Sequence, residues 1–282
     1  MGNEIPNFTL HDGEKMPAVG LGTFSLKGSE GVEAMKSAMA QGYRLLDTAY
    51  NYENEGAVGR AIAESGVARE ELFVTSKLPG RYQEYDKALV ALKESLYRAN
   101  LDYVDLYLIH WPNPRRDKYV EAWQAMIDAQ KEGLIKSLGV SNFLPEYIDR
   151  LEKETGVLPT VNQIELHPYF NQKEQRAYHA EKGIITQSWS ALGRADLGNV
   201  LEIETVKEIA QEKGKSAAQV VLRWVYQLNT ASIPRSLNAG RQKENISIFD
   251  FELSGAEMEK MNAISRPDGR LLDQNPAEYE EF

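Results

Sequence analysis

The chain has 282 residues, 42% of them hydrophobic and 26% charged, which is enough for one large barrel or two ordinary domains with a substantial core. It contains no cysteine, which excludes disulfides, thiolate metal ligands and a cysteine nucleophile. Its formal net charge of −10 argues against a general nucleic-acid or anionic-membrane surface, and no segment has the roughly 20 apolar residues of a membrane span.

The N-terminal segment has neither a basic start nor an apolar stretch of signal-peptide length. We therefore expect a cytoplasmic protein with no membrane partner and no nucleic-acid partner. The segment "FTLHDGEKM" at 8–16 follows, and its Asp-Gly turn between two short runs predicts a hairpin.

Eight short apolar runs then recur along the chain, and most are typical of strands that are buried on both faces. They lie at 18–23, 43–48, 72–78, 103–110, 134–142, 160–166, 184–190 and 230–236. Segments with helical spacing lie between them, for example at 30–42, 84–100, 118–133 and 216–229. Glycines that end helices occur at Gly42, Gly66, Gly133, Gly156 and Gly183.

This alternation predicts an α/β fold, a (β/α)₈ TIM barrel formed by residues 1–282 as a single domain, with the hairpin at the barrel bottom. A doubly wound sheet is the alternative. The segment 266–282 has little periodicity, and we expect it to wrap the surface as a loop.

Polar side chains of differing chemistry stand at or near the ends of seven predicted strands. In chain order they are Asp47, Lys77, His110, Ser141 with Asn142, Gln163 with Glu165, Trp189, and Arg235 with Ser236. Because the carboxyl ends of the strands in a (β/α)₈ barrel meet at one mouth, this pattern predicts a reaction site there.

Four side chains, Asp47, Tyr52, Lys77 and His110, together favour protonation of a carbonyl oxygen. Free tyrosine, with a pKa of roughly 10, is a poor acid near neutrality. A lysine cation lowers that pKa, and an aspartate holds the lysine in place. A histidine hydrogen bond orients and polarises the carbonyl. None of these groups can supply a hydride, so a cofactor must.

Each residue also has a structural alternative when it is taken alone. Asp47 could cap the next helix, Lys77 could be a surface lysine, and His110 could be a core histidine. Tyr52 could be a packing residue without a chemical role. It is much less probable that all four residues stand at the mouth of the barrel for unrelated structural reasons than that they share one function.

The same residues and their neighbours resemble the aldo-keto reductases, over nearly the full length from "MPAVGLGTF" to "ENISIFDFELS". The aspartate and tyrosine lie in "GYRLLDTAYNYENE", the lysine in "VTSKL" and the histidine in "VDLYLIHWP". The segments "GVSNF", "VNQIELHP", "SWSALG" and "IPRSLNAGRQKEN" resemble the cofactor segments of that family.

The resemblance implies an NADPH-dependent reductase of aldehydes or ketones, of the alcohol dehydrogenase (NADP+) type, with Tyr52 as the proton donor. It implies a small-molecule carbonyl substrate and no metal, and we expect a monomer. Phe24, Tyr52, His110 and Trp111 are the predicted substrate contacts.

The chain has no GxGxxG after a strand, so the Rossmann fingerprint is excluded as the cofactor site. Trp189 offers a flat face to a nicotinamide, and Ser141, Asn142 and Gln163 can hydrogen-bond its carboxamide. The resemblance suggests that the loop 190–200 folds over the pyrophosphate. The full predicted cofactor set is Gly22, Thr23, Phe24, Asp47, Ser141, Asn142, Gln163, Trp189, Ser190, Leu192, Gly193, Arg194, Arg235, Ser236, Asn238, Arg241, Glu244 and Asn245.

The segment "PRSLNAGRQKEN" at 234–245 is basic at its start in an acidic protein. Arginine binds phosphate bidentately, so Arg235, Ser236 and Arg241 favour NADPH over NADH. The family usually has lysine where Arg235 stands, a change of geometry but not of charge. Pro79 and Gly80 depart from the family pattern, and we expect them to alter one wall of the substrate pocket.

Three other functions stay open. A Schiff-base aldolase could use Lys77 as its nucleophile. A non-catalytic NADPH-sensing accessory protein is the second. A zinc hydrolase is weaker, because none of the four histidines pair at ligand spacing.

Overall fold

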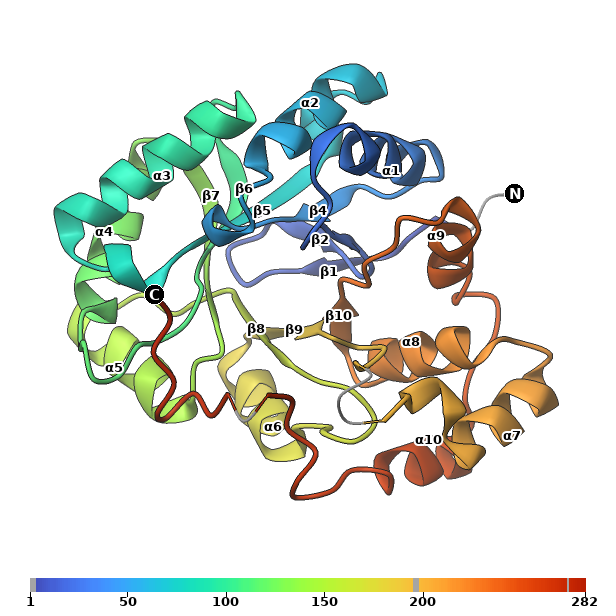
Figure 1. Ribbon diagram of the computed structural model, residues 1–282. Coiled ribbons are helices and arrows are strands. Elements are labelled where there is room, and N and C mark those ends of the chain that lie inside the picture. The colour runs from blue at the N-terminus through green and yellow to red at the C-terminus, as the bar shows by residue number, and fades with distance from the viewer. Residues whose placement is uncertain (1–3, 195–197, 273) are drawn as a thin grey trace.

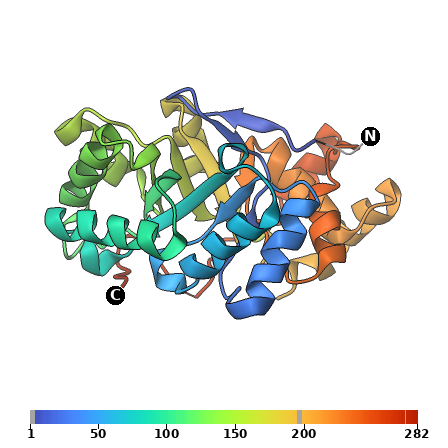
Figure 2. The ribbon, with the colours of Figure 1, turned by 90° about the horizontal axis from the view of Figure 1, so that it is seen from above.

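Eight parallel strands in chain order form a single curled sheet, with helices around its outside (Figure 1, Figure 2). The structure is a computed structural model that describes residues 4–194, 198–272 and 274–282. The strands are β3 (Leu21–Gly22), β4 (Leu45–Asp47), β5 (Phe73–Leu78), β6 (Val104–Ile109), β7 (Ile135–Ser141), β8 (Val161–Glu165), β9 (Ile185–Trp189) and β10 (Thr230–Ser232).

The sheet closes between its first and last strands. Val19, just before β3, forms a parallel bridge with Ser232 of β10. The Gly20 N–H donates to the Ser232 carbonyl at 2.8 Å, and the Ser232 N–H donates to the Ala18 carbonyl at 2.9 Å. The predicted (β/α)₈ barrel is confirmed, and the doubly wound alternative is wrong.

Ten α-helices occur in the described part of the chain, and eight of them follow the strands in turn. Those eight are α1 (Gly28–Ala40), α2 (Glu55–Ser65), α3 (Tyr85–Ala99), α4 (Tyr119–Lys131), α5 (Pro145–Thr155), α6 (Lys173–Lys182), α8 (Ala217–Gln227) and α9 (Ala239–Ile246). The other two, α7 (Glu204–Lys213) and α10 (Gly255–Asn262), contact each other beside α8 (Figure 1). No helix among these described residues is long and apolar enough to cross a membrane.

The N-terminal hairpin seals the end of the barrel opposite the strands' carboxyl ends. It consists of β1 (Asn7–Thr9) and the antiparallel β2 (Lys15–Pro17). Its Leu10 and Met16 join one apolar cluster with Leu45, Phe73 and other inward-facing residues near the strand starts. The hairpin at the barrel bottom is therefore confirmed (Figure 2).

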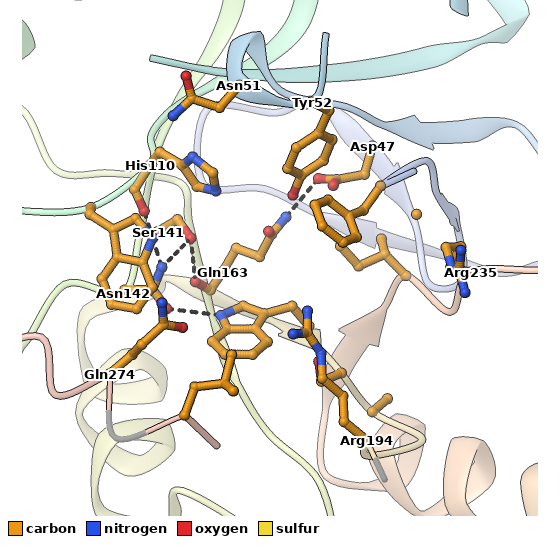
Figure 3. Close-up of a pocket in the computed structure, with 18 of the residues that line it drawn as sticks. Asp47, Asn51, Tyr52, His110, Ser141, Asn142, Gln163, Arg194, Arg235 and Gln274 are labelled. Atoms are coloured by element: carbon orange, nitrogen blue, oxygen red, sulfur yellow. Dashed lines mark hydrogen bonds between the residues drawn. The ribbon is translucent and has the colours of Figure 1, made fainter. Parts of the chain in front are cut away.

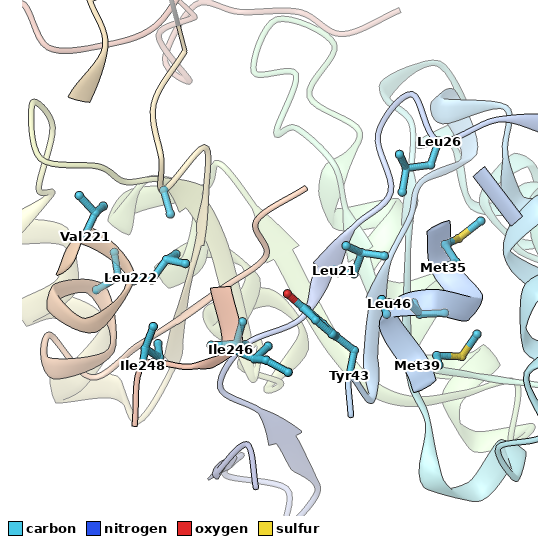
Figure 4. Packing of buried hydrophobic residues seen from close by; sticks show 14 of the residues in the cluster. Leu21, Leu26, Met35, Met39, Tyr43, Leu46, Val221, Leu222, Ile246 and Ile248 are labelled. Atoms are coloured by element: carbon cyan, nitrogen blue, oxygen red, sulfur yellow. The ribbon is translucent and has the colours of Figure 1, made fainter. Parts of the chain in front are cut away.

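Apolar packing between α1, α8 and α9 fixes the position of the segment that follows β10 (Figure 4). Tyr43 is fully buried in this cluster, near Met39, Leu46 and Ile246. Its hydroxyl donates to the backbone carbonyl of Gln242 in α9 at 2.9 Å. The first turn of α9 is thus tied to the barrel wall rather than to solvent.

The C-terminal tail, defined here as residues 266–282, has no helix or strand among its described residues, as predicted. It runs from α10 past α6 to the neighbourhood of α4 (Figure 1). The Leu271 N–H donates to the buried Glu165 carboxylate at 2.6 Å, and the Asn113 side-chain amide donates to the Glu281 carbonyl at 2.7 Å. The tail is therefore bound at two points near the carboxyl ends of the strands.

Candidate active site

A cavity of about 730 Å³ lies at the carboxyl ends of the strands (Figure 3). It brings together most of the residues that the sequence singled out. Those that line it are Gly22, Phe24, Asp47, Tyr52, His110, Trp111, Ser141, Asn142, Gln163, Trp189, Ser190, Leu192, Gly193, Arg194 and Arg235. The tail adds Leu272, Gln274, Tyr279 and Glu281.

Asp47 and Lys77 form an ion pair in the barrel interior. Asp47 ends β4, Lys77 lies in β5, and the Lys77 Nζ to Asp47 Oδ1 distance is 2.5 Å. Lys77 is completely buried, so it is not a surface lysine. Burial alone would lower the pKa of Lys77, but the charge of Asp47 and hydrogen bonds to Asp47 and Tyr52 outweigh it and raise the pKa. Lys77 therefore carries its charge inside the barrel.

The structural alternative for Asp47 is also wrong, because Asp47 does not cap α2. The residue before α2 is Asn54, whose amide donates to the carbonyls of Thr23 and Leu26 at 2.7 and 3.0 Å. Asn54 thereby holds the turn between β4 and α2 against the loop after β3. The Asp47 carboxylate is not used as a helix cap and pairs with Lys77.

Tyr52 ends a short 3₁₀ helix, Tyr50–Tyr52, and its hydroxyl lies 3.3 Å from Lys77 Nζ. Its ring packs edge-on against Phe24, with the ring centroids 5.1 Å apart. Burial raises the pKa of Tyr52, and the opposing charge of Lys77 only partly offsets this. Lys77 lowers the pKa of Tyr52 as expected, but burial is the larger effect, so the pKa in the folded protein lies above its usual value.

His110 follows β6 and faces the cavity, with its ring centroid 6.0 Å from that of Tyr52. It is thus a cavity residue rather than a core histidine. A carboxylate that the sequence did not predict lies beside it: Oε1 of Glu281, in the tail, is 2.7 Å from His110 Nδ1. The acidic stretch "AEYEEF" holds no pattern that distinguishes Glu281 from Glu278 or Glu280.

The predicted nicotinamide contacts already form one hydrogen-bonded network. The Gln163 amide donates to Asp47 Oδ2 and to Gln187, each at 2.7 Å. The Trp189 indole N–H donates to Asn142 Oδ1 at 2.8 Å, and the Asn142 amide donates to Ser141 Oγ at 2.9 Å. The network fixes Gln163 with its carbonyl oxygen left as the acceptor, and it links these residues to the Asp47–Lys77 pair.

Several predicted cofactor residues do not line the cavity. Thr23 is buried, and its hydroxyl donates to the Asp47 carbonyl at 2.9 Å. The others lie at or near α9: Ser236, Asn238, Arg241, Glu244 and Asn245. Asn238 caps α9 by accepting from the Arg241 N–H at 3.0 Å, and the Arg241 residue is exposed in the first turn.

The two arginines that line the cavity lie across it from His110 (Figure 3). Arg235 donates to Ser25 Oγ, and the Arg194 guanidinium lies 6.0 Å from the centre of the Phe24 ring. Of the loop 190–200 that was predicted to cover a pyrophosphate, residues 195–197 lie outside the described residues.

The walls of the cavity opposite these arginines are largely aromatic. Trp111 packs on Tyr279 of the tail, with ring centroids 4.4 Å apart. Pro79 and Gly80 are not themselves among the lining residues, so the change to a pocket wall that was expected from them stays a prediction. The Gly80 N–H instead donates to the Glu281 carboxylate at 3.0 Å.

Comparison with known proteins gives one consistent result. The model of the Aldo/keto reductase family matches residues 18–266. The chain is 47% identical over 278 residues to 2,5-diketo-D-gluconic acid reductase B of Corynebacterium sp. (strain SHS752001), covering 99% of each protein. It is 46% identical over 270 residues to glyoxal reductase of Bacillus subtilis (strain 168), covering 95% of each. The crystal structure of a variant of Gox0644 in complex with NADPH matches with a TM-score of 0.93 and 39% identity, over 99% of this chain and 100% of that one.

Proposed function

The chain belongs to the aldo/keto reductase family, and we propose that it reduces aldehyde or ketone carbonyls to alcohols with NADPH, as an enzyme of the alcohol dehydrogenase (NADP+) type. The observation that carries the proposal is the arrangement of Tyr52, Lys77 and His110. A phenol backed by a buried ammonium group faces a cavity, and an imidazole faces the same space 6.0 Å away, ring centre to ring centre.

Tyr52 is the proton donor in this proposal, and its raised pKa is compatible with that role. A phenol with a raised pKa stays protonated at neutral pH, so Tyr52 carries the proton that it must donate before the reaction begins. As an alkoxide develops on the substrate, the phenol gives up its proton, and the Lys77 cation 3.3 Å away stabilises the resulting phenolate. Asp47 keeps Lys77 in place, and His110 orients the carbonyl oxygen toward Tyr52.

The residues present fit NADPH. Trp189 presents an aromatic face to the cavity, and Gln163 has a free carbonyl oxygen that suits a carboxamide NH₂. Two arginines, Arg194 and Arg235, supply positive charge to the same cavity in a protein of net charge −10. When bound, NADPH supplies the hydride that no side chain of the protein can provide.

The decisive test is Tyr52→Phe, assayed by loss of NADPH absorbance with a panel of aldehydes, diketones, α-keto acids and keto-sugars. The substitution removes only the hydroxyl, so kcat should fall by about 10²-fold or more while NADPH binding, followed by fluorescence, is unchanged.

The matched control is Tyr50→Phe. Tyr50 lies on the same 3₁₀ helix, but its hydroxyl accepts from Arg98 at 2.9 Å and does not face the cavity. Near-normal activity of Tyr52→Phe would remove Tyr52 from its role. NADPH binding without turnover of any carbonyl in the panel would favour the sensing protein, and borohydride trapping of a substrate on Lys77 would favour the aldolase.

A further inference from the structure

Glu165 is a buried carboxylate at the end of a barrel strand that the proposed roles leave unused. It is the last residue of β8, two positions beyond Gln163, and it is 2% exposed. Its Oε1 accepts from the Leu271 N–H at 2.6 Å and is hydrogen-bonded to His167 Nε2 at 2.9 Å. Its Oε2 has no hydrogen-bond partner among the described residues, and Glu165 is not one of the residues that line the cavity. The side chain thus connects β8 to the tail.

The tail lies closely against the loop after β8 just before it reaches Glu165. The Arg266 N–H donates to the Tyr169 carbonyl at 3.0 Å. At Gly269 the two backbones approach so closely that an added Cβ would lie 1.9 Å from the Tyr169 carbonyl oxygen. The side chain of Leu271 is fully buried. These contacts determine the path of the tail at this point and bring the Leu271 N–H to Glu165.

Directly beyond Leu271 the tail enters the cavity. Leu272 and Gln274 line it, and further along Tyr279 packs on Trp111, with ring centroids 4.4 Å apart. Leu272 has a φ of 55°, in the left-handed region, which a leucine adopts only where its surroundings impose it. The hydrogen bond at Leu271 is such a constraint, because it fixes the chain one residue earlier.

One strong hydrogen bond has a large effect in this segment, because the tail has little regular structure. Its described residues form no helix or strand, so its position depends on contacts with the rest of the chain. A hydrogen bond to a carboxylate is roughly twice as strong as one between neutral groups, and burial strengthens it further. The bond to Glu165 therefore fixes the tail close to the point where it enters the cavity.

We propose that Glu165 is a positioning residue that holds the tail at Leu271, so that the tail forms one wall of the substrate pocket. Glu165 touches neither substrate nor cofactor in this role. It increases the fraction of molecules in which the wall is in place, and a ligand that needs the wall binds more weakly as that fraction falls. The part that concerns the substrate rests on the proposed function, whereas the position of the tail does not.

The first experiment measures hydrogen exchange of the tail amides by mass spectrometry, in the full chain without ligand. Wild type should protect the Leu271 amide. A hydrogen bond to a charged group is worth roughly ten- to hundredfold in an equilibrium constant, so Glu165→Ala should speed exchange in the tail by that order. Glu165→Gln keeps an acceptor oxygen and should recover part of the protection. An unprotected Leu271 amide in wild type, or unchanged exchange in Glu165→Ala, would overturn the proposal.

The matched control for this experiment is Glu278→Ala. It removes an exposed carboxylate of the tail that does not line the cavity, and tail exchange should not change. Peptides from β5 and β6 provide an internal reference, and they should exchange at the same rate in Glu165→Ala and in wild type because the opening is local. Faster exchange throughout the barrel would show that Glu165 supports the strands instead, and would overturn the proposal.

The second experiment separates KM from kcat, with the carbonyl of the panel that wild type reduces best. Glu165→Ala should raise KM for this carbonyl by about tenfold, as the fraction with a complete wall falls. The kcat and the Kd of NADPH should stay within about twofold, since the reacting groups keep their places. In a Tyr279→Ala background, Glu165→Ala should raise KM less, because part of the wall is already missing.

Equal increases in KM in both backgrounds would show that Glu165 does not act through the wall, and would overturn the proposal. Weaker NADPH binding with an unchanged KM would overturn it too, because Glu165 would then act on Gln163 through β8. If wild type reduced no carbonyl at all, the proposed function would be wrong, while hydrogen exchange would still decide whether Glu165 holds the tail.

Discussion

Every hydrogen-bonding atom of the Asp47–Lys77 pair has a protein partner, although both side chains are shut off from water. Lys77 Nζ donates to Asp47 Oδ1, to the Thr48 carbonyl at 2.9 Å and to Tyr52, which uses its three protons. Asp47 Oδ2 accepts from Gln163. A buried ion pair offsets its desolvation only when its remaining sites are satisfied in this way. The pair can therefore keep its charge beside Tyr52.

A second buried carboxylate, Glu55, is less well compensated and gives a pH-dependent prediction. Burial raises the pKa of Glu55, although the hydrogen bond from Ser76 and the charge of Arg98 oppose the shift. The folded protein therefore holds the Glu55 proton more tightly than the unfolded chain, and stability falls as pH rises through the folded pKa. Glu55→Gln should be more stable than wild type at pH 8, by on the order of 1 kcal/mol, and no more stable at pH 4.

Urea unfolding of both proteins across this pH range checks the prediction. The control is Glu94→Gln, an exposed acid that pairs with the same Arg98 at 2.9 Å and should change stability by less than about 0.5 kcal/mol. A Glu55→Gln protein that is less stable than wild type at pH 8 would show that the contact with Arg98, at 3.7 Å, outweighs burial.

At the residue scale, the sequence predicted the positions of side chains that stand at the ends of strands. Asp47 and Trp189 end strands, so the barrel geometry alone puts them at the mouth. Glu281 could not be found this way, because it reaches the site through a tail whose path depends on tertiary contacts such as that of Asn113. The effect of burial on the Tyr52 pKa could not be foreseen, because the extent of burial cannot be read from neighbouring charges.

At the scale of elements, α9 combines an exposed first turn with a fixed position. Asn238 caps it, and Tyr43 ties it to the barrel. Helix amino termini favour anions, and Arg241 adds a full charge there. We expect Arg241→Ala to weaken NADPH by roughly ten- to hundredfold and to leave NADH nearly unchanged, since only NADPH has the extra phosphate.

Fluorescence titration of wild type and variant with both cofactors tests this, with Trp189 as the reporter. Lys243→Ala provides the control, because Lys243 is exposed and basic on the same helix but lies in its last turn. Equal loss of affinity for NADH and NADPH would make Arg241 structural rather than a phosphate contact.

The sequence has a helix-like stretch at 239–247, and the observed α9 ends one residue earlier, at Ile246. No prediction was made for α7 and α10. They lie outside the strand–helix repeat, so the alternation of eight units gave no reason to expect them.

At the scale of the whole molecule, the seam between β3 and the end of β10 decides whether the barrel closes. Gly22 stands at this seam, where an added Cβ would lie 2.6 Å from the Ile233 carbonyl oxygen. Backbone cannot yield as a side chain can, so Gly22→Ala should cost about 1–3 kcal/mol of stability. The loss should appear as a lower urea midpoint with an unchanged slope.

Gly255→Ala is the control for this substitution. No atom lies within 4 Å of a Cβ added at Gly255, and its backbone is not left-handed. That variant should match or slightly exceed wild type. If Gly22→Ala proved as stable as wild type, the backbone at Ile233 would be able to move away from the added methyl group at little cost.

The same seam constrains the order in which the protein can be made. Its bridge joins Val19 to Ser232, more than two hundred residues apart, so a growing chain cannot close the barrel until β10 has left the ribosome. Until then the edges of β3 and β9 lack their final partners, and such edges can pair with other chains. The pocket cannot be complete any earlier, because Glu281, which lines it, follows β10 in the chain. A nascent chain stalled before residue 230 would therefore hold Asp47, Lys77 and His110 and yet have neither a closed barrel nor a finished pocket.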